Sequence, residues 1–333
     1  MTPHPRVACT CALLAAAIPL LAGCEGQQSA LDPAGPNARE IAALWWSMAA
    51  GAAVIFALVL GALLYGMFGR GKLRERVKST PLIVVGGIVL PIVTLSVLVP
   101  FNVYVAAGVT EAREPDTLTI RVHGRQWWWD IEYDDGTDAG TFTTANEIWL
   151  PLDEPVELIL TSADVIHSLW FPRLAGKLDL VPGRTNRLMI EADTPGVMRG
   201  QCAEFCGVGH AKMALYAVAV TPGEFAEWSE RQRNPALPAA DSTQAGAELF
   251  SASGCSLCHA VRGHGAWGRA GPDLTHVGSR LTIGAGLIDN TAENIAQWIA
   301  HNDALKRGNK MPDYSDLSPE ALHAIAQYLE SLE

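Results

Sequence analysis

The chain has 333 residues, 49% of them hydrophobic, and a formal net charge of −11 at pH 7 with a pI near 5.3. This acidic balance argues against a nucleic acid as a partner. The length leaves room for two small domains beside any membrane segment, so a single-domain protein is not expected.

The first residues of the chain are typical of an export signal. Arg6 precedes an apolar run, Ala12 to Leu21, that is too short to cross a bilayer. The ending Leu-Ala-Gly-Cys24 resembles a bacterial lipobox, which predicts a lipoprotein-type signal peptide over residues 1–23 and lipidation of Cys24. Ordinary cleavage nearby, with an incidental cysteine, is the alternative. Both interpretations predict an exported chain.

Two long uncharged segments predict a transmembrane hairpin within residues 24–108. The spans are expected at about 41–68 and 82–105, each long enough for the roughly 20 apolar residues that cross a bilayer. Prolines 91 and 100 are expected to kink the second span. Five cations lie between the spans, at residues 70–78, and short cationic loops stay in the cytoplasm. The rest of the chain is therefore expected on the periplasmic side of a bacterial inner membrane.

The stretch at residues 109–230 predicts an all-β domain. Gly, Pro and Asp clusters separate short runs that are rich in β-branched and aromatic residues, a pattern that favours an antiparallel sandwich or barrel. Up to about residue 225 the sequence predicts no long amphipathic helix. Strands are expected at about residues 118–122, 127–133, 147–150, 156–161, 187–191 and 214–221.

Soft metal ligands crowd the loop before the last predicted strand. Thiolate, thioether and imidazole groups together select copper. His167, just past an earlier predicted strand, supplies a second imidazole that the loop itself lacks. A structural disulfide is the alternative, but it would leave the loop histidine and methionine without a role. The loop residues concerned are Cys202, Glu204, Cys206, His210 and Met213.

After a Pro/Ala-rich linker at residues 231–241, residues 242–333 predict a small all-α domain that carries haem. Cys255-x-x-Cys258-His259 is the motif for covalent attachment of c-type haem, with His259 as the proximal iron ligand. Met311 is the only methionine of this domain and is expected to be the second iron ligand. Helices are expected from about residue 243, over 294–301 and over 319–329.

The chain resembles subunit II of the haem-copper respiratory oxidases, of the caa type in which a class I cytochrome c domain is fused to subunit II. The resemblance covers about residues 40–230 and is most specific in the copper-binding loop. It rests on Gln126 to Trp129, Ser162 to Ser168, Lys177 to Asn186, Gly200 to Gly207 and, in the C-terminal domain, Gly271 to Arg280 and Gly308 to Tyr314.

The resemblance implies a multidomain membrane protein: a two-helix hairpin, a cupredoxin (Greek-key barrel) domain and a cytochrome c domain. It implies a binuclear CuA centre in which Cys202 and Cys206 bridge two coppers, while His167 and His210 each bind one. Met213 would be a weak ligand, and Glu204 would bind through its backbone carbonyl, with its carboxylate facing a magnesium site at the subunit I interface. Trp127 would be the residue through which electrons reach the copper.

The implied function is electron transfer within cytochrome c oxidase, an oxidoreductase and translocase. Electrons would pass from a donor, such as a cytochrome c or an upstream bc complex, through haem c and CuA to subunit I, which reduces oxygen to water. No catalytic residue is expected in this chain, and subunit III is expected in the same complex. The small subunit of a CuA-containing nitric oxide reductase is the alternative, and a free-standing electron carrier is a further one.

One departure from the family pattern concerns protons. Subunit II often carries Glu-x-x-Trp-Thr ahead of the proline in its second span, where the glutamate serves the mouth of a proton channel. The corresponding positions here are Val84 and Gly87. The sequence therefore gives no basis for assigning proton uptake to this chain.

Overall fold

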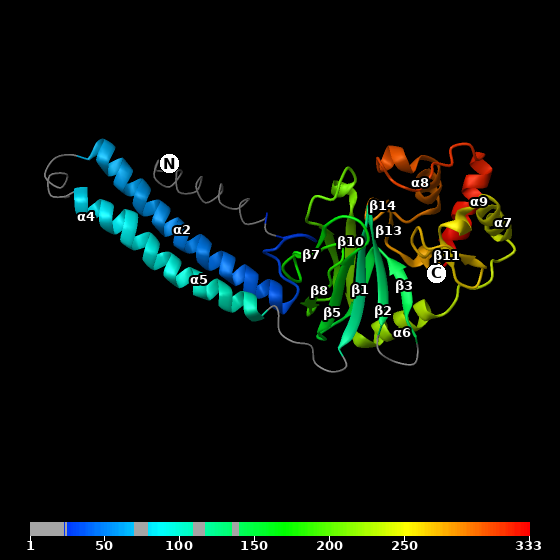
Figure 1. The fold of residues 1–333 in the computed structure, drawn as a ribbon, viewed down its shortest axis with the longest axis horizontal. Helices are drawn as coiled ribbons and strands as arrows, with labels where there is room; N and C mark the ends of the chain where they lie inside the picture. Colours follow the sequence, from blue (N-terminus) through cyan, green and yellow to red (C-terminus); the bar gives the residue numbers. More distant parts are fainter. Residues whose placement is uncertain (1–22, 24, 70–78, 109–116, 135–139) are drawn as a thin grey trace, which may run out of the picture.

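The computed structural model describes residues 23, 25–69, 79–108, 117–134 and 140–333. Three parts follow one another along its longest axis: a pair of long helices, a β-sandwich and a helical domain (Figure 1). The predicted signal peptide, the lipidation of Cys24 and the cationic loop at residues 70–78 lie outside the described residues.

The two long helical segments match the predicted hairpin in position and composition. The first is α2 (Pro36–Phe68), and the second consists of α4 (Ser79–Val84), the π-helical turn η1 (Val85–Val89) and α5 (Leu90–Gly108). Both are long and apolar enough to cross a membrane, and their most apolar stretches are not buried within the protein. Lipid rather than protein would therefore cover these side chains.

The second segment changes its winding just ahead of a proline. Pro91 lacks a backbone N–H, and its ring crowds the carbonyl four residues earlier, at Gly87. The chain accommodates this with the π-helical turn η1, which contains Gly87, and then continues as α5 through Pro100. The prolines therefore leave one long helical segment, in which the irregularity precedes Pro91.

The β-sandwich consists of two five-stranded sheets, so the predicted all-β fold is confirmed. One sheet has the order β3-β2-β1-β5-β8 and the other β4-β10-β9-β6-β7, with parallel pairs β1–β5 and β4–β10 among antiparallel ones. The strands are β1 (Leu118–Arg125), β2 (Trp128–Asp134), β3 (Phe142–Ala145), β4 (Glu147–Pro151), β5 (Val156–Ser162), β6 (His167–Trp170), β7 (Leu178–Leu180), β8 (Asn186–Ile190), β9 (Gly196–Cys202) and β10 (Ala214–Val220).

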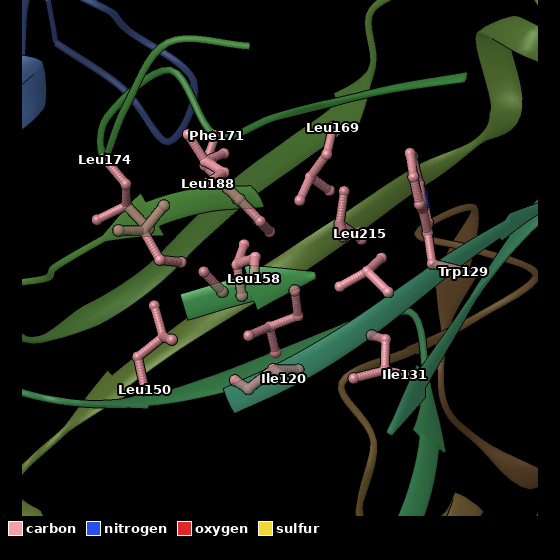
Figure 2. Close-up of a cluster of buried hydrophobic side chains, with 14 of the residues drawn as sticks. Ile120, Trp129, Ile131, Leu150, Leu158, Leu169, Phe171, Leu174, Leu188 and Leu215 are labelled. Atoms are coloured by element: carbon pink, nitrogen blue, oxygen red, sulfur yellow. The ribbon is translucent and has the colours of Figure 1, made fainter. Parts of the chain in front are cut away.

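Alternating side chains of the two sheets meet to form the core of the sandwich. Ile120, Ile131 and Leu158 from one sheet face Leu169 and Leu215 from the other, and all are fully buried (Figure 2). Strands β1 and β2 show this alternation, whereas β5 and β10 are nearly continuous buried runs; all four were predicted from the sequence. Strands β3, β6, β7 and β9 were not predicted.

The C-terminal domain is helical, as predicted. Its helices are α7 (Gln244–Ala252), α8 (Ala292–Leu305) and α9 (Pro319–Glu330), and Ser318 caps α9 by accepting a bond from the Ala321 N–H. Short elements fill the connections: η3 (Cys255–Leu257), β11 (Ala260–Val261), β12 (Ala266–Trp267), η4 (Val277–Ser279), β13 (Thr282–Ile283) and β14 (Ile288–Asp289).

An unpredicted helix, α6 (Pro222–Arg233), leaves the sandwich at β10. Thr221 and Glu224 form a capping box at its start, and Trp228 from its middle stacks on Trp149 with ring centroids 5.0 Å apart. The capping box at Thr221 and Glu224 was the sequence signal for α6. The helix itself is mostly polar, so hydrophobic periodicity does not reveal it.

The sandwich and the C-terminal domain pack directly against each other (Figure 1). The contact is polar as well as apolar, and it joins residues of β3, β4 and β10 to the segment from Asp273 to Ala285. Three of the hydrogen bonds that cross it run from Ala214 N to Ala285 O (3.0 Å), from Thr143 Oγ1 to Asp273 Oδ2 (3.2 Å) and from Leu281 N to Glu147 Oε1 (2.6 Å).

Candidate metal centres

The predicted copper ligands converge at one end of the sandwich. Cys202 ends β9, and β9 pairs with β6 so that Leu169 lies opposite Cys202 and His167 begins the neighbouring strand. The chain then loops through Cys206 to the short helix η2 (His210–Lys212) before it enters β10. Strand pairing thus brings His167 to a loop that lies 35 residues away in the sequence.

The donor atoms lie within a few ångströms of one another. The sulfurs of Cys202 and Cys206 are 3.7 Å apart, which is much longer than a disulfide bond of about 2.05 Å. Both thiols are free, so the disulfide alternative is not what the structure contains. The other separations are Cys202 Sγ to His167 Nδ1 3.9 Å, Cys202 Sγ to Glu204 O 3.2 Å, Cys206 Sγ to His210 Nδ1 3.6 Å and Cys206 Sγ to Met213 Sδ 3.8 Å.

This donor set fits copper in its chemistry. Two thiol sulfurs, two imidazole nitrogens, a thioether and a carbonyl lie together, and the donor atoms of His167, Cys202 and Cys206 are all within 4.8 Å of one another. The thiol–thiol contact lowers the pKa of Cys202 and raises that of Cys206. Cys202 is therefore the thiol that ionises more readily, and the thiolate is the form that binds a metal.

Two groups outside the donor set hold it in place. Asp164 Oδ1 lies 2.9 Å from His167 Nε2, so the nitrogen on the other side of the ring faces Cys202. The indole of Trp127 and the side-chain amide of Gln126 both donate to the Cys206 carbonyl, at 2.9 and 2.8 Å. Neither Asp164 nor Gln126 was predicted as a contact of the cluster. Gln126 lies 80 residues from Cys206 in the sequence, whereas Asp164 precedes His167 by only three residues, so its contact is a local one.

The three tryptophans at residues 127–129 lie in different environments. Trp129 is fully buried in the sandwich core. Trp128 is partly exposed, with the Arg125 guanidinium 5.5 Å above its ring. Trp127 is 7% exposed and lies between the copper cluster and the C-terminal domain.

Glu204 contributes its backbone oxygen to the cluster and directs its carboxylate elsewhere. The carboxylate lies 4.0 Å from Lys177 Nζ, and both side chains are about half exposed. Lys177 also reaches toward the Ala203 carbonyl at 3.5 Å. A cavity beside this pair is lined by residues of the copper loop and of the segment that leads to α2.

A cavity of about 290 Å³ lies in the C-terminal domain where it meets Gln126 to Trp128 and Asn146 of the sandwich, and the haem-attachment motif lines it. The cavity has a mostly apolar wall that includes Phe250, Leu274, Trp298, Ile299 and Leu329. Cys255, Cys258, His259 and Met311 all line it, so the structure brings together all four residues that the sequence predicted for haem. Thiols, an imidazole and a thioether around an apolar slot fit a covalently attached haem.

His259 is oriented by the segment that follows the motif. Its Nδ1 lies 2.8 Å from the Pro272 carbonyl, which leaves Nε2 for iron. Burial lowers the pKa of His259, so the ring is neutral at pH 7, the form that binds a metal. Gly271 packs so closely on this ring that a Cβ there would lie 2.4 Å from Cε1.

Two other histidines of this domain, His264 and His276, form hydrogen bonds through both ring nitrogens. His264 lies 2.7 Å from Tyr328 Oη and 2.7 Å from the Leu237 carbonyl. His276 lies 2.9 Å from both the Asn234 and Glu333 backbone oxygens. Neither His264 nor His276 lines the haem cavity.

Comparison with known families agrees with this division of the chain. Residues 139–220 match the model of the family described as cytochrome C oxidase subunit II, periplasmic domain. Residues 243–333 match the model of the family described as cytochrome c. The first family implies CuA copper and the second implies haem c.

Individual relatives cover nearly the whole chain. The cytochrome c oxidase subunit 2 of Alkalihalophilus pseudofirmus is 35% identical over 328 residues, which are 94% of this chain and 94% of the relative. That of Bacillus subtilis is 30% identical over 301 residues, 84% of this chain and 83% of the relative. Among solved structures, the periplasmic domain of subunit II of the Bradyrhizobium japonicum cytochrome oxidase is 32% identical, covers 36% of this chain and 96% of that one, and superposes with a TM-score of 0.34.

Proposed function

The chain belongs to the cytochrome c oxidase subunit II family, in the caa form with a fused cytochrome c domain, and from this premise we propose that it conducts electrons from an external donor to subunit I. It is a component of a membrane-anchored oxidoreductase complex and associates with subunit I. The proposed order of carriers is the haem in the C-terminal domain, the copper pair in the sandwich, and then the oxygen-reducing site of subunit I.

The observation that carries this order is the position of Trp127. Its ring lines the haem cavity, and its indole N–H donates to the carbonyl of Cys206, a proposed copper ligand. One residue thus contacts both proposed cofactor sites. The haem iron and the copper pair would supply the reversible one-electron chemistry, and this chain would fix their ligands and separation.

Each proposed ligand residue is assigned to either the copper pair or the haem. Cys202 and Cys206 would bridge the coppers, with His167, His210, Met213 and the Glu204 carbonyl completing the set. In the other domain, Cys255 and Cys258 would attach the haem, and His259 and Met311 would bind its iron. The convergence of these donors supports the assignment. The rigid β scaffold suits a relay, since small rearrangement between oxidation states favours fast transfer.

Finer features of the complex follow from the same family pattern. We propose that the Glu204 carboxylate faces subunit I and helps to bind magnesium there, because it points away from the copper donors. The two apolar helices would anchor the chain with both metal domains in the periplasm. Subunit III and a soluble cytochrome c or a bc complex are the proposed neighbours, and the acidic chain suits a basic donor.

Single-turnover absorption measurements on the purified complex test the proposed order. A donor mixed rapidly with the oxidised complex should reduce the haem c first, the copper pair next and the haem of subunit I last. In a Met311→Ala variant the first step should slow. Reduction of the copper pair ahead of the haem by the protein donor would contradict the proposed order.

A further inference from the structure

A buried lysine lies at the contact between the two metal domains. Lys306 is 2% exposed and directly follows α8 of the C-terminal domain. Its Nζ donates to the backbone carbonyl of Trp127 in the sandwich, at 2.6 Å, and to that of Gly284 in its own domain, at 2.8 Å. The amine therefore bridges the two domains through main-chain oxygens.

The buried amine of Lys306 is held by hydrogen bonds and has no ion-pair partner among the described residues. Burial lowers the pKa of Lys306 to about 7. Burying an amine is costly unless it is hydrogen bonded, and an apolar side chain would fill the same space without that cost. The contacts of the Nζ atom, rather than its volume, account for a lysine here.

The contacted residue is the one that touches both proposed cofactor sites. Trp127 lines the haem cavity and donates through its indole to Cys206 O at 2.9 Å. Trp127 is therefore bound at two points. Its backbone carbonyl accepts a hydrogen bond from Lys306 of the haem domain, and its indole N–H donates one to Cys206 of the copper loop. The position of Trp127 relative to the haem is thus set partly by Lys306.

The loop after Lys306 reinforces the same contact. Gly308 adopts a φ of +78° and lies so close to the sandwich that a Cβ would come within 2.7 Å of Val208 Cγ2 and 3.3 Å of the Trp127 ring. Asn302, which is fully buried, accepts a bond from Asn309 at 2.8 Å and donates to the Pro312 carbonyl at 2.9 Å. The loop that ends in Met311 is therefore held on both sides.

We propose that Lys306 is a positioning residue that fixes the haem domain on Trp127 and thereby sets the rate of electron transfer from haem to copper. This inference rests on the proposed function, because it presupposes that transfer. One electron crosses at a time, from the reduced haem to the oxidised copper pair. No covalent bond forms or breaks, and Lys306 itself is neither oxidised nor reduced.

The test compares Lys306→Met with Arg307→Met in the complete complex. Both variants replace a basic side chain of the same loop with methionine, but Arg307 is exposed whereas Lys306 is buried. Two quantities are measured in each complex: the haem-to-copper transfer rate after rapid reduction of the haem, and amide hydrogen exchange in residues 282–286 and 306–311. Haem and copper content are read from the absorption spectra.

Lys306→Met is expected to slow the transfer several-fold, because the haem domain is then no longer held at a fixed distance from Trp127 and electron transfer slows as that distance increases. It should also speed amide exchange in both segments, leave both cofactor spectra unchanged and leave reduction of the haem by the donor unchanged. Arg307→Met should match the wild type. In a double-mutant cycle with Trp127→Phe, the two effects should not add, because Lys306 acts through Trp127.

The remaining outcomes each contradict the inference. Wild-type transfer and exchange in Lys306→Met would show that the lysine does not position the domains. Loss of haem or copper from that variant would assign Lys306 a structural role instead. A wild-type complex in which electrons never pass from haem to copper would contradict the proposed function itself, and this inference with it.

Discussion

Met213 shows how a single weak ligand can be tested. Its sulfur lies 3.8 Å from that of Cys206 and its side chain is buried. Leucine has a similar volume but no donor atom, so Met213→Leu should preserve the fold. The copper potential is expected to rise by some tens of millivolts, because a thioether that donates to the metal is lost. Redox titration of the copper absorption measures this shift.

The haem provides the internal reference for that variant. It lies in a separate domain, bound by residues that do not include Met213, so its spectrum and potential should not change. A Met213→Leu complex that loses its haem signal while its copper potential stays at the wild-type value would contradict the assignment of Met213.

Gly271 gives a second test at the scale of one residue. A Cβ at this position would lie 2.4 Å from Cε1 and 2.8 Å from Nδ1 of His259. Gly271→Ala should therefore push the imidazole out of line with the haem and lower the haem content several-fold, as measured by absorption of the purified chain. Gly223→Ala is the matched control, since a Cβ there meets nothing within 4 Å. Equal haem content in the two variants would refute this role of Gly271.

At the scale of the elements, β4 carries a buried carboxyl group that connects the domains. Glu147 is 2% exposed and accepts bonds from the backbone of Leu281 at 2.6 Å and Thr282 at 3.4 Å. Burial raises its pKa from 4.5 to about 7, although the nearby Arg280 opposes this. Between pH 4.5 and about pH 7, Glu147 is therefore protonated in the folded chain and ionised in the unfolded chain.

This shift predicts a pH dependence with a definite sign. The stabilisation that the protonated Glu147 provides is fully present below pH 4.5. It is lost as the pH rises to about 7, which lowers the free energy of unfolding by about 3 kcal/mol. Glu147→Gln keeps an acceptor oxygen but does not titrate. The thermal midpoint of the wild type should therefore fall relative to that of Glu147→Gln as the pH rises through this range. The exposed Glu154→Gln variant should follow the wild type, and parallel curves for all three proteins would exclude this role.

The elements also show what the sequence could predict. Strands β1, β2 and β5 alternate buried and exposed residues or form apolar runs, and the periodicity located them. Strands β6 and β7 have four and three residues, too few to show a period, and they exist through pairing with β9 and with each other. Helix α6 is polar, so its cap was the available signal.

The candidate sites divide in the same way. Cys202 to Met213 and Cys255 to His259 are local motifs, so spacing alone predicted chemistry that the structure then brings together. Other contacts of the two sites join distant parts of the chain: Gln126 lies beside Cys206, 80 residues away, and Lys306 lies beside Trp127, 179 residues away. Such contacts depend on how sheets and domains pack, which no local pattern encodes.

At the scale of the whole molecule, the two metal domains lie in the order of the proposed electron route. The haem cavity of the C-terminal domain adjoins Trp127, Trp127 adjoins the copper cluster, and the sandwich lies between that domain and the apolar hairpin (Figure 1). Trp127 is 7% exposed, so the fused domain covers the residue that a soluble donor would otherwise contact. A donor is therefore expected to deliver its electrons to the haem.

Oxygen uptake by the native complex, purified from membranes through a tag on this chain and supplied with reduced soluble cytochrome c, tests the assignment to an oxidase most directly. Oxygen should be consumed, and the haem c and copper absorption bands should change between their oxidised and reduced forms during uptake. A complex that leaves oxygen untouched but consumes nitric oxide through a partner with b-type haem would contradict the assignment to an oxidase.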